Sequence, residues 1–180
     1  MILRELNQYS NNITAGQILY LLGQNDKGYF SREVGLSRLN DLIKTVGNED
    51  TIGAGEGQLF DGSGLDRRNR VTASLITKLL VKANADFAVG PELISSLSRY
   101  KRSGTLKDRA FGKGDTKAYA DSGNIWGKTG TLHGVSSLAG YLQMKSGRRL
   151  AYAIIVNGGL SKDTAVKIEK NITEVLVGAK

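Results

Sequence analysis

The residues of this sequence best suited to chemistry are Lys128-Thr129-Gly130-Thr131, which follow a strand-like lead-in. A lysine followed by a hydroxyl residue and a glycine on an edge strand suits the capture of an anionic substrate. The lysine supplies a positive point charge, and the glycine has no side chain to block the approach of a backbone. This stretch therefore predicts a binding site for a negatively charged group.

A second candidate stands near the start, where Ser10-Asn11-Asn12 directly precedes a helix-like segment. Serine and asparagine are preferred N-caps, so helix capping is one interpretation of these residues. The other interpretation is a functional role in a cleft shared with Lys128. The two interpretations are compatible, because a residue can cap a helix and also face a cleft.

Ser-x-Asn and Lys-Thr-Gly, in this order, match two of the three short motifs shared by penicillin-binding proteins and serine β-lactamases. Between them, residues 57–72 resemble the class C low-molecular-mass penicillin-binding proteins, the D-alanyl-D-alanine carboxypeptidase/endopeptidase family. Those proteins carry a similar Asp-Gly-Ser-Gly-Leu-x-Arg-x-Asn-Arg-Val segment. Residues 103–109, 127–141 and 148–158 are similar to the same family. The resemblance covers nearly the whole chain and implies a β-lactamase/transpeptidase-like fold.

The segment around Asp61 has a structural interpretation beside the family one. Asp-Gly and Ser-Gly pairs are strong turn signals, and an aspartate can fix such a loop by local hydrogen bonds. Asp61, Ser63 and Arg67 match the family segment. We assign them no catalytic step.

The third family motif, Ser-x-x-Lys, carries the nucleophile and precedes Ser-x-Asn by a long interval. None of the nine residues before Ser10 supplies it. The forward match, Ser98-Arg99-Tyr100-Lys101, falls between the other two motifs and is therefore in the wrong order. We expect residues 1–180 to be the C-terminal part of a single penicillin-binding domain, without the Ser-x-x-Lys segment.

The resemblance implies catalytic roles for Ser10, Asn12, Lys128 and Thr131. Acyl transfer needs a nucleophile, a base, an oxyanion hole and a pocket for the substrate carboxylate. Ser10 would pass a proton to the leaving-group nitrogen, and Asn12 would hydrogen-bond the substrate's peptide carbonyl. Lys128 would lend positive potential, and the Thr131 N–H would be one oxyanion donor.

The resemblance also implies that Thr129, Gly130 and Thr131 bind substrate, with the two threonine hydroxyls holding its carboxylate. The expected ligand is a peptidoglycan stem peptide or a β-lactam. We expect no cofactor and no metal. Cysteine is absent, and the lone His133 cannot form a histidine cluster.

We therefore expect a fragment of a serine-type D-Ala-D-Ala carboxypeptidase/endopeptidase, a hydrolase of the bacterial cell wall. Alone it would be inactive, and its partner would be the missing N-terminal segment of the same domain. The alternative is a non-catalytic module that binds peptidoglycan peptides or has a structural role. A third hypothesis is a self-sufficient hydrolase that uses Ser98 and Lys101. The order of the motifs argues against it, because Ser98 follows the Ser-x-Asn motif instead of preceding it.

The formal net charge of +8 comes from 25 Lys and Arg against 17 Asp and Glu. The positive residues form small groups such as Lys101 and Arg102, without the interleaved aromatics of a nucleic-acid motif, so we expect no nucleic acid. A basic surface could also favour approach to an anionic cell-wall polymer. No apolar run is long enough for a membrane span, and the charged N-terminus does not look like a secretory signal. The resemblance implies a place in the cell envelope or periplasm.

Periodicity and turn residues predict an α+β arrangement in which helices precede a three-stranded antiparallel meander and a C-terminal helix. The predicted helices before the strands span residues 12–22, 31–46, 72–83 and 91–97. The predicted C-terminal helix begins near Ser161. The predicted strands span residues 126–131, 136–144 and 149–157. The implied fold would lack its N-terminal strands here. We therefore expect an exposed apolar sheet edge or face, and a homodimer that covers it.

Overall fold

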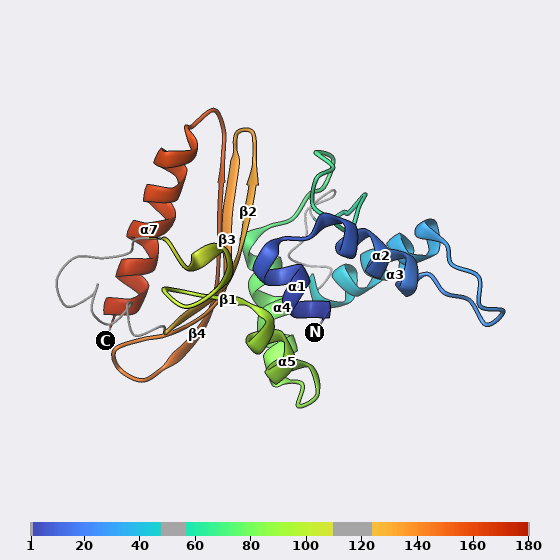
Figure 1. The fold of residues 1–180 in the computed structure, drawn as a ribbon, viewed down its shortest axis with the longest axis horizontal. Coiled ribbons are helices and arrows are strands. Elements are labelled where there is room, and N and C mark those ends of the chain that lie inside the picture. Colours follow the sequence, from blue (N-terminus) through green and yellow to red (C-terminus); the bar gives the residue numbers. More distant parts are fainter. Residues whose placement is uncertain (1, 48–56, 110–123, 180) are drawn as a thin grey trace.

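The computed structural model describes residues 2–47, 57–109 and 124–179 (Figure 1). The helices that come first in the chain are α1 (Ile2–Tyr9), α2 (Asn12–Leu22), α3 (Arg32–Gly47), α4 (Ala73–Ala85) and α5 (Val89–Ser96). The elements of the second half are β1 (Ser98–Arg99), a 3₁₀ turn η1 (Gly104–Leu106), β2 (Ile125–Leu132), β3 (Val135–Gln143), β4 (Arg149–Asn157) and α7 (Lys162–Gly178). The predicted α+β order is confirmed.

The strands form one antiparallel sheet in the order β1-β2-β3-β4. The predicted hairpin between β3 and β4 is present, and Met144 N–H donates to the Arg148 carbonyl at 2.7 Å to close it. The prediction of three strands is corrected to four, because the two-residue β1 pairs with Trp126 and Gly127. Within the described residues, β1 stops there, so the outer edge of β2 is unpaired from Lys128 onwards.

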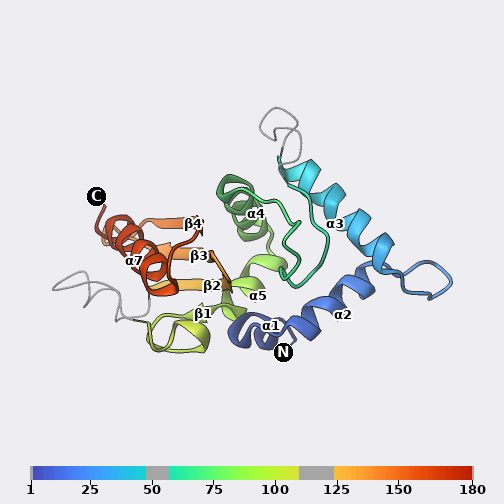
Figure 2. The same cartoon turned by 90° about the horizontal axis from the view of Figure 1, so that it is seen from above.

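Helices cover both faces of the sheet (Figure 2). Helix α7 lies against one face, and α4 lies against the other. Tyr141 on β3 donates a hydrogen bond from its hydroxyl to the Leu80 carbonyl of α4 at 2.7 Å. The main hydrophobic core consists of Tyr100, Leu106, Ile125, Leu138, Leu142, Met144, Tyr152, Ile154 and Val177. Apolar burial on this scale supplies most of the free energy that holds the β2–β3 hairpin in place.

A buried polar cluster around Glu169 joins α7 to the sheet. The Glu169 side chain is fully buried, accepts a hydrogen bond from the Ser136 hydroxyl at 2.7 Å and pairs with Arg109 at 2.6 Å. Ser136 lies directly opposite Thr131 in the β2–β3 register. The cluster therefore fixes the hairpin at the level of Thr131, because a buried carboxylate needs these partners.

Helices α2 and α3 form a hairpin that extends away from the sheet (Figure 1). Its helices approach closely at Gly23 and Gly35, where any Cβ would collide with the backbone of the other segment. A second core of Ile43, Val46 and Leu75 joins α3 to α4. This core fixes the base of the hairpin beside the sheet.

The expected exposed apolar sheet face does not occur among the described residues. Their exposed large apolar side chains lie on helices and loops, with many on α2 and α3, including Ile13, Leu21 and Leu42. The reason is that α4 and α7 cover the two faces of the sheet. A homodimer through the sheet stays a prediction.

Candidate active site

Ser10 lies at the junction of α1 and α2 in a left-handed backbone conformation, with a φ of 56°. Asn11 N–H donates to the Leu6 carbonyl at 3.2 Å, which closes α1 around Ser10 in the manner of a Schellman turn. Asn11 also caps α2, because its side chain accepts a hydrogen bond from the Thr14 N–H at 3.1 Å. Asn11 thus takes the capping role, so the side chains of Ser10 and Asn12 do not have to serve it.

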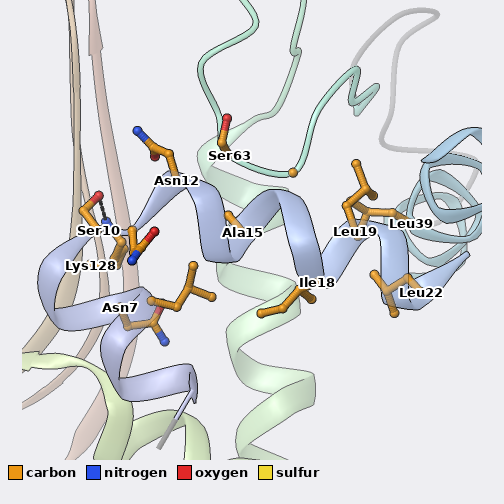
Figure 3. Close-up of a pocket in the computed structure, with 13 residues that line it drawn as sticks. Asn7, Ser10, Asn12, Ala15, Ile18, Leu19, Leu22, Leu39, Ser63 and Lys128 are labelled. Atoms are coloured by element: carbon orange, nitrogen blue, oxygen red, sulfur yellow. Dashed lines mark hydrogen bonds between the residues drawn. The ribbon is translucent and has the colours of Figure 1, made fainter. Parts of the chain in front are cut away.

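Lys128 reaches Ser10 across 118 residues of sequence. Its ammonium group donates to the Ser10 hydroxyl oxygen at 2.7 Å and to the Thr129 carbonyl at 2.8 Å. Figure 3 shows this contact beside α2. Burial lowers the pKa of Lys128 below its ordinary value, because desolvation disfavours the charged ammonium. Both acceptors of the Lys128 ammonium are neutral oxygens. An anionic ligand beside Lys128 would supply the negative charge that they do not.

Thr129 is held by the segment that follows β1. Its hydroxyl donates to the Thr105 hydroxyl at 2.9 Å, and the Thr105 N–H donates to the Ser98 hydroxyl at 3.1 Å. Ser98 is fully buried, and its hydroxyl is occupied by Thr105. The Lys101 ammonium lies 5.8 Å from the centroid of the Tyr100 ring. This geometry argues against Ser98 as a nucleophile, because a buried and occupied hydroxyl cannot meet a substrate.

All six residues that the sequence singled out line one cleft of about 590 Å³. They are Ser10, Asn12, Lys128, Thr129, Gly130 and Thr131. The cleft also contains Arg67 and Arg70, to which sequence reasoning assigned no function. The cleft therefore brings a lysine, two arginines, several hydroxyls and the open edge of β2 around one space.

The loop between Asp61 and Asn69 forms the far side of this cleft, and its interpretation as a turn fixed by an aspartate is confirmed. The Asp61 carboxylate accepts hydrogen bonds from Ser63 Oγ at 2.6 Å and from Asn69 Nδ2 at 2.6 Å. It also accepts from the Gly64 and Leu65 N–H groups. Burial acts to raise the pKa of Asp61, but these hydrogen bonds outweigh it and hold that pKa below its ordinary value.

Arg67 connects this loop to the β2–β3 turn by donating to the His133 carbonyl at 2.9 Å. The two residues are 66 positions apart. Sequence reasoning noted the match of Arg67 to the family segment, but no local spacing could place it at the end of β2. Among the described residues, no group of three or more His, Asp or Glu side chains could hold a metal ion.

The sequence of this chain matches a known protein family. Residues 1–178 match the profile of the D-Ala-D-Ala carboxypeptidase 3 (S13) family. The chain belongs to the S13 family. An S13 relative, the D-alanyl-D-alanine carboxypeptidase of Actinomadura sp. (strain R39), is 34% identical over 166 residues, which are 87% of this chain and 28% of the relative. Carboxypeptidase DacB of Mycolicibacterium smegmatis is 34% identical over 158 residues, covering 86% of this chain and 33% of that protein.

Solved structures show the same fold. Penicillin-binding protein 4 (dacB) of Haemophilus influenzae, complexed with a β-lactam, matches with a TM-score of 0.76 and 23% identity. The match covers 99% of this chain and 41% of that one. The predatory endopeptidase Bd0816 of Bdellovibrio bacteriovorus, in complex with an immunity protein, matches with a TM-score of 0.73 and 22% identity over 98% of this chain and 42% of that one. The chain spans about a third of the length of the curated S13 relatives it matches.

The left-handed conformation of Ser10 predicts a difference between two variants that both lose the hydroxyl. Ser10→Gly should be more stable than Ser10→Ala by about 1 kcal/mol, because glycine adopts this conformation without a Cβ clash. Chemical denaturation of both variants measures the difference in the free energy of unfolding. Equal stabilities would show that the backbone at Ser10 carries no strain.

The lowered pKa of Lys128 predicts a pH dependence of stability. An unfolded lysine titrates near its ordinary pKa of about 10.4, so between the lowered folded value and this one the unfolded chain binds more protons. The contribution of Lys128 to stability should therefore increase as the pH rises through its folded pKa.

Denaturation curves at a series of alkaline pH values measure this slope for the natural chain and for Lys128→Met. The Met variant should lose the part of the slope that Lys128 causes. Identical slopes for the two proteins would contradict the burial of the ammonium.

Proposed function

We propose that this chain is the substrate-binding, C-terminal part of a serine-type D-Ala-D-Ala carboxypeptidase/endopeptidase that acts on peptidoglycan peptides. The observation that carries the proposal is the Lys128–Ser10 hydrogen bond of 2.7 Å inside the cleft that also contains Thr129 and Thr131. Membership of the S13 family and the names of its relatives support the reaction class. Work on a cell-wall peptide would place the protein in the bacterial envelope or periplasm.

The direction of the hydrogen bond between Lys128 and Ser10 suits a proton relay. A lysine ammonium has only donors, so the Ser10 oxygen accepts and its own O–H remains available to donate. In acyl transfer, Ser10 would give this proton to the leaving-group nitrogen and regain one from the general base, after that base has taken the nucleophile's proton. Asn12, on the same junction, would hydrogen-bond the carbonyl of the substrate's peptide.

Beyond Gly127, the outer edge of β2 suits an extended peptide, because the described residues pair it only as far as that glycine. An incoming peptide could add to this edge as a further strand. The Thr131 hydroxyl would bind its terminal carboxylate, and the Thr129 hydroxyl would join it by turning away from Thr105, with Lys128 supplying charge. The Thr131 N–H would contribute one of two oxyanion donors, and the other would come with the nucleophile.

An apolar groove of about 290 Å³ beside this contact suits the segment that would bring the nucleophile. Leucine and isoleucine side chains of α2, with Leu6 and Leu39, line it, and it reaches Ser10 and Lys128 at one end (Figure 3). Burying apolar side chains here would stabilise the joined segments by about 25 cal/mol per Å². A Ser-x-x-Lys segment that packs into this groove would place its serine near Lys128.

The proposal predicts that the isolated chain is not acylated by penicillin. Intact-mass spectrometry after incubation with the drug should show an unchanged mass, because residues 1–180 contain no Ser-x-x-Lys motif before Ser10. Joining the chain to an upstream segment that carries the motif should restore labelling on the serine of that segment. Labelling of Ser98 or any other serine of the isolated chain would contradict the proposal.

A further inference from the structure

A second polar pocket, of about 530 Å³, opens beside the cleft between α1 and the segment that follows β1. Three cationic side chains, Arg4, Arg102 and Lys107, line it. The other lining residues are Gln8, Tyr9, Ser103, Gly104 and Thr105. No carboxylate is among them. Three like charges around one polar space repel one another, and the binding of an anion would relieve this repulsion.

The floor of this pocket is a fixed loop. Lys101 and Gly104 both have left-handed backbones, with φ values of 56° and 59°. The Arg102 and Ser103 N–H groups donate to the Arg99 carbonyl at 3.0 and 2.9 Å, and the Ser103 hydroxyl accepts from the Arg99 N–H. A non-glycine residue in this conformation is costly, and such residues cluster at functional sites. The loop therefore fixes the backbone that carries Arg102 before any ligand arrives.

Helix α1 supplies the opposite wall. Arg4 and Gln8 are four residues apart and so lie on one face of the helix. Gln8 is only 5% exposed, and its amide donates a long hydrogen bond of 3.4 Å to the Leu97 carbonyl. Gly104 packs directly on Gln8, since a Cβ at that glycine would lie 2.9 Å from the Gln8 carbonyl oxygen. Helix α1 and the loop at Gly104 are thus closely packed, and the buried Gln8 amide lies at the base of the pocket.

A hydrogen bond between two threonine hydroxyls lies where the pocket adjoins the cleft. Thr105 lines the pocket, Thr129 lines the cleft, and their hydroxyls are 2.9 Å apart. A ligand bound along β2 could therefore place a second group in the pocket without leaving the surface. The two spaces therefore adjoin at Thr105 and Thr129, with Lys128 lining the cleft and two arginines and a lysine lining the pocket.

We infer that this pocket is an anion subsite that binds an oxyanion, a carboxylate or a phosphate, carried by the polymer whose peptide occupies the cleft. Guanidinium groups bind both kinds of oxyanion in bidentate fashion, and the Lys107 ammonium adds a point charge. The inference deepens the proposed function and rests on it for the identity of the polymer. A carboxylate would come from a stem peptide, and a phosphate from an anionic wall polymer.

The test is a titration of the ¹⁵N-labelled full chain, followed by NMR, with inorganic phosphate and with acetate at constant ionic strength. At least one of the two anions should produce saturable shifts of the Arg102, Ser103 and Thr105 amide signals. Tighter binding of acetate would indicate a stem-peptide carboxylate, and tighter binding of phosphate would indicate an anionic wall polymer. In the double variant Arg102→Ala/Lys107→Ala the affinity should fall by about tenfold or more, since two charge-assisted contacts are lost.

The matched control is Arg148→Ala/Arg149→Ala, which removes the same charge from the end of the β3–β4 turn and the first residue of β4, outside the pocket. This control should bind the anions as the natural chain does. Shifts that do not saturate, or an equal loss of affinity in both double variants, would overturn the subsite. This titration measures anion binding and not acylation. Failure of the subsite and failure of the proposed reaction are therefore distinguished by separate measurements.

Discussion

The site depends on the requirement that a half-buried lysine ammonium must find oxygen acceptors. Lys128 finds them in the Ser10 hydroxyl and the Thr129 carbonyl. A charge removed from water is costly unless it is hydrogen-bonded or paired. Because these two acceptors do not neutralise the charge, the ammonium keeps an attraction for an anion. This requirement joins the α1–α2 junction to β2 and defines what the cleft can bind.

Separate parts of the structure fix Ser10, Thr129 and the β2–β3 hairpin in position. Asn11 closes both helices around Ser10, and Thr105 holds the hydroxyl of Thr129. Glu169 fixes the hairpin from the opposite face of the sheet through Ser136. Each of these partners lies on a different element. Displacement of one element would therefore change the geometry of the cleft without touching any of the six motif residues.

The sequence predicted the elements well where a periodic pattern was long. Helix α2 begins and ends at the predicted residues, and the three long strands and α7 agree to within a few positions. The prediction missed α1, whose eight residues make barely two turns, and β1, whose two residues are too short to show a period. It left open whether Ser10-Asn11-Asn12 caps a helix or faces a cleft, and the structure gives the cap to Asn11 and the cleft to Ser10 and Asn12.

The sequence predicted which residues form the candidate site, but not the contacts that hold them in position. The six motif residues meet in one cleft, as their order along the chain indicated. The contacts of Thr105 with Thr129 and of Arg67 with His133 join positions 24 and 66 residues apart. Such pairs depend on how the loops pack, and no local spacing encodes that. The roles of the six residues in a reaction stay predictions.

If the proposed function holds, this chain by itself contains the part of the site that binds the substrate. An NMR titration of the ¹⁵N-labelled chain with N-acetyl-D-Ala-D-Ala measures this binding directly. We expect saturable shifts at Lys128, Thr129 and Thr131, and also at Ser10, with all of them lost in Lys128→Ala. Shifts absent from these residues, or unchanged in that variant, would contradict substrate binding by this chain.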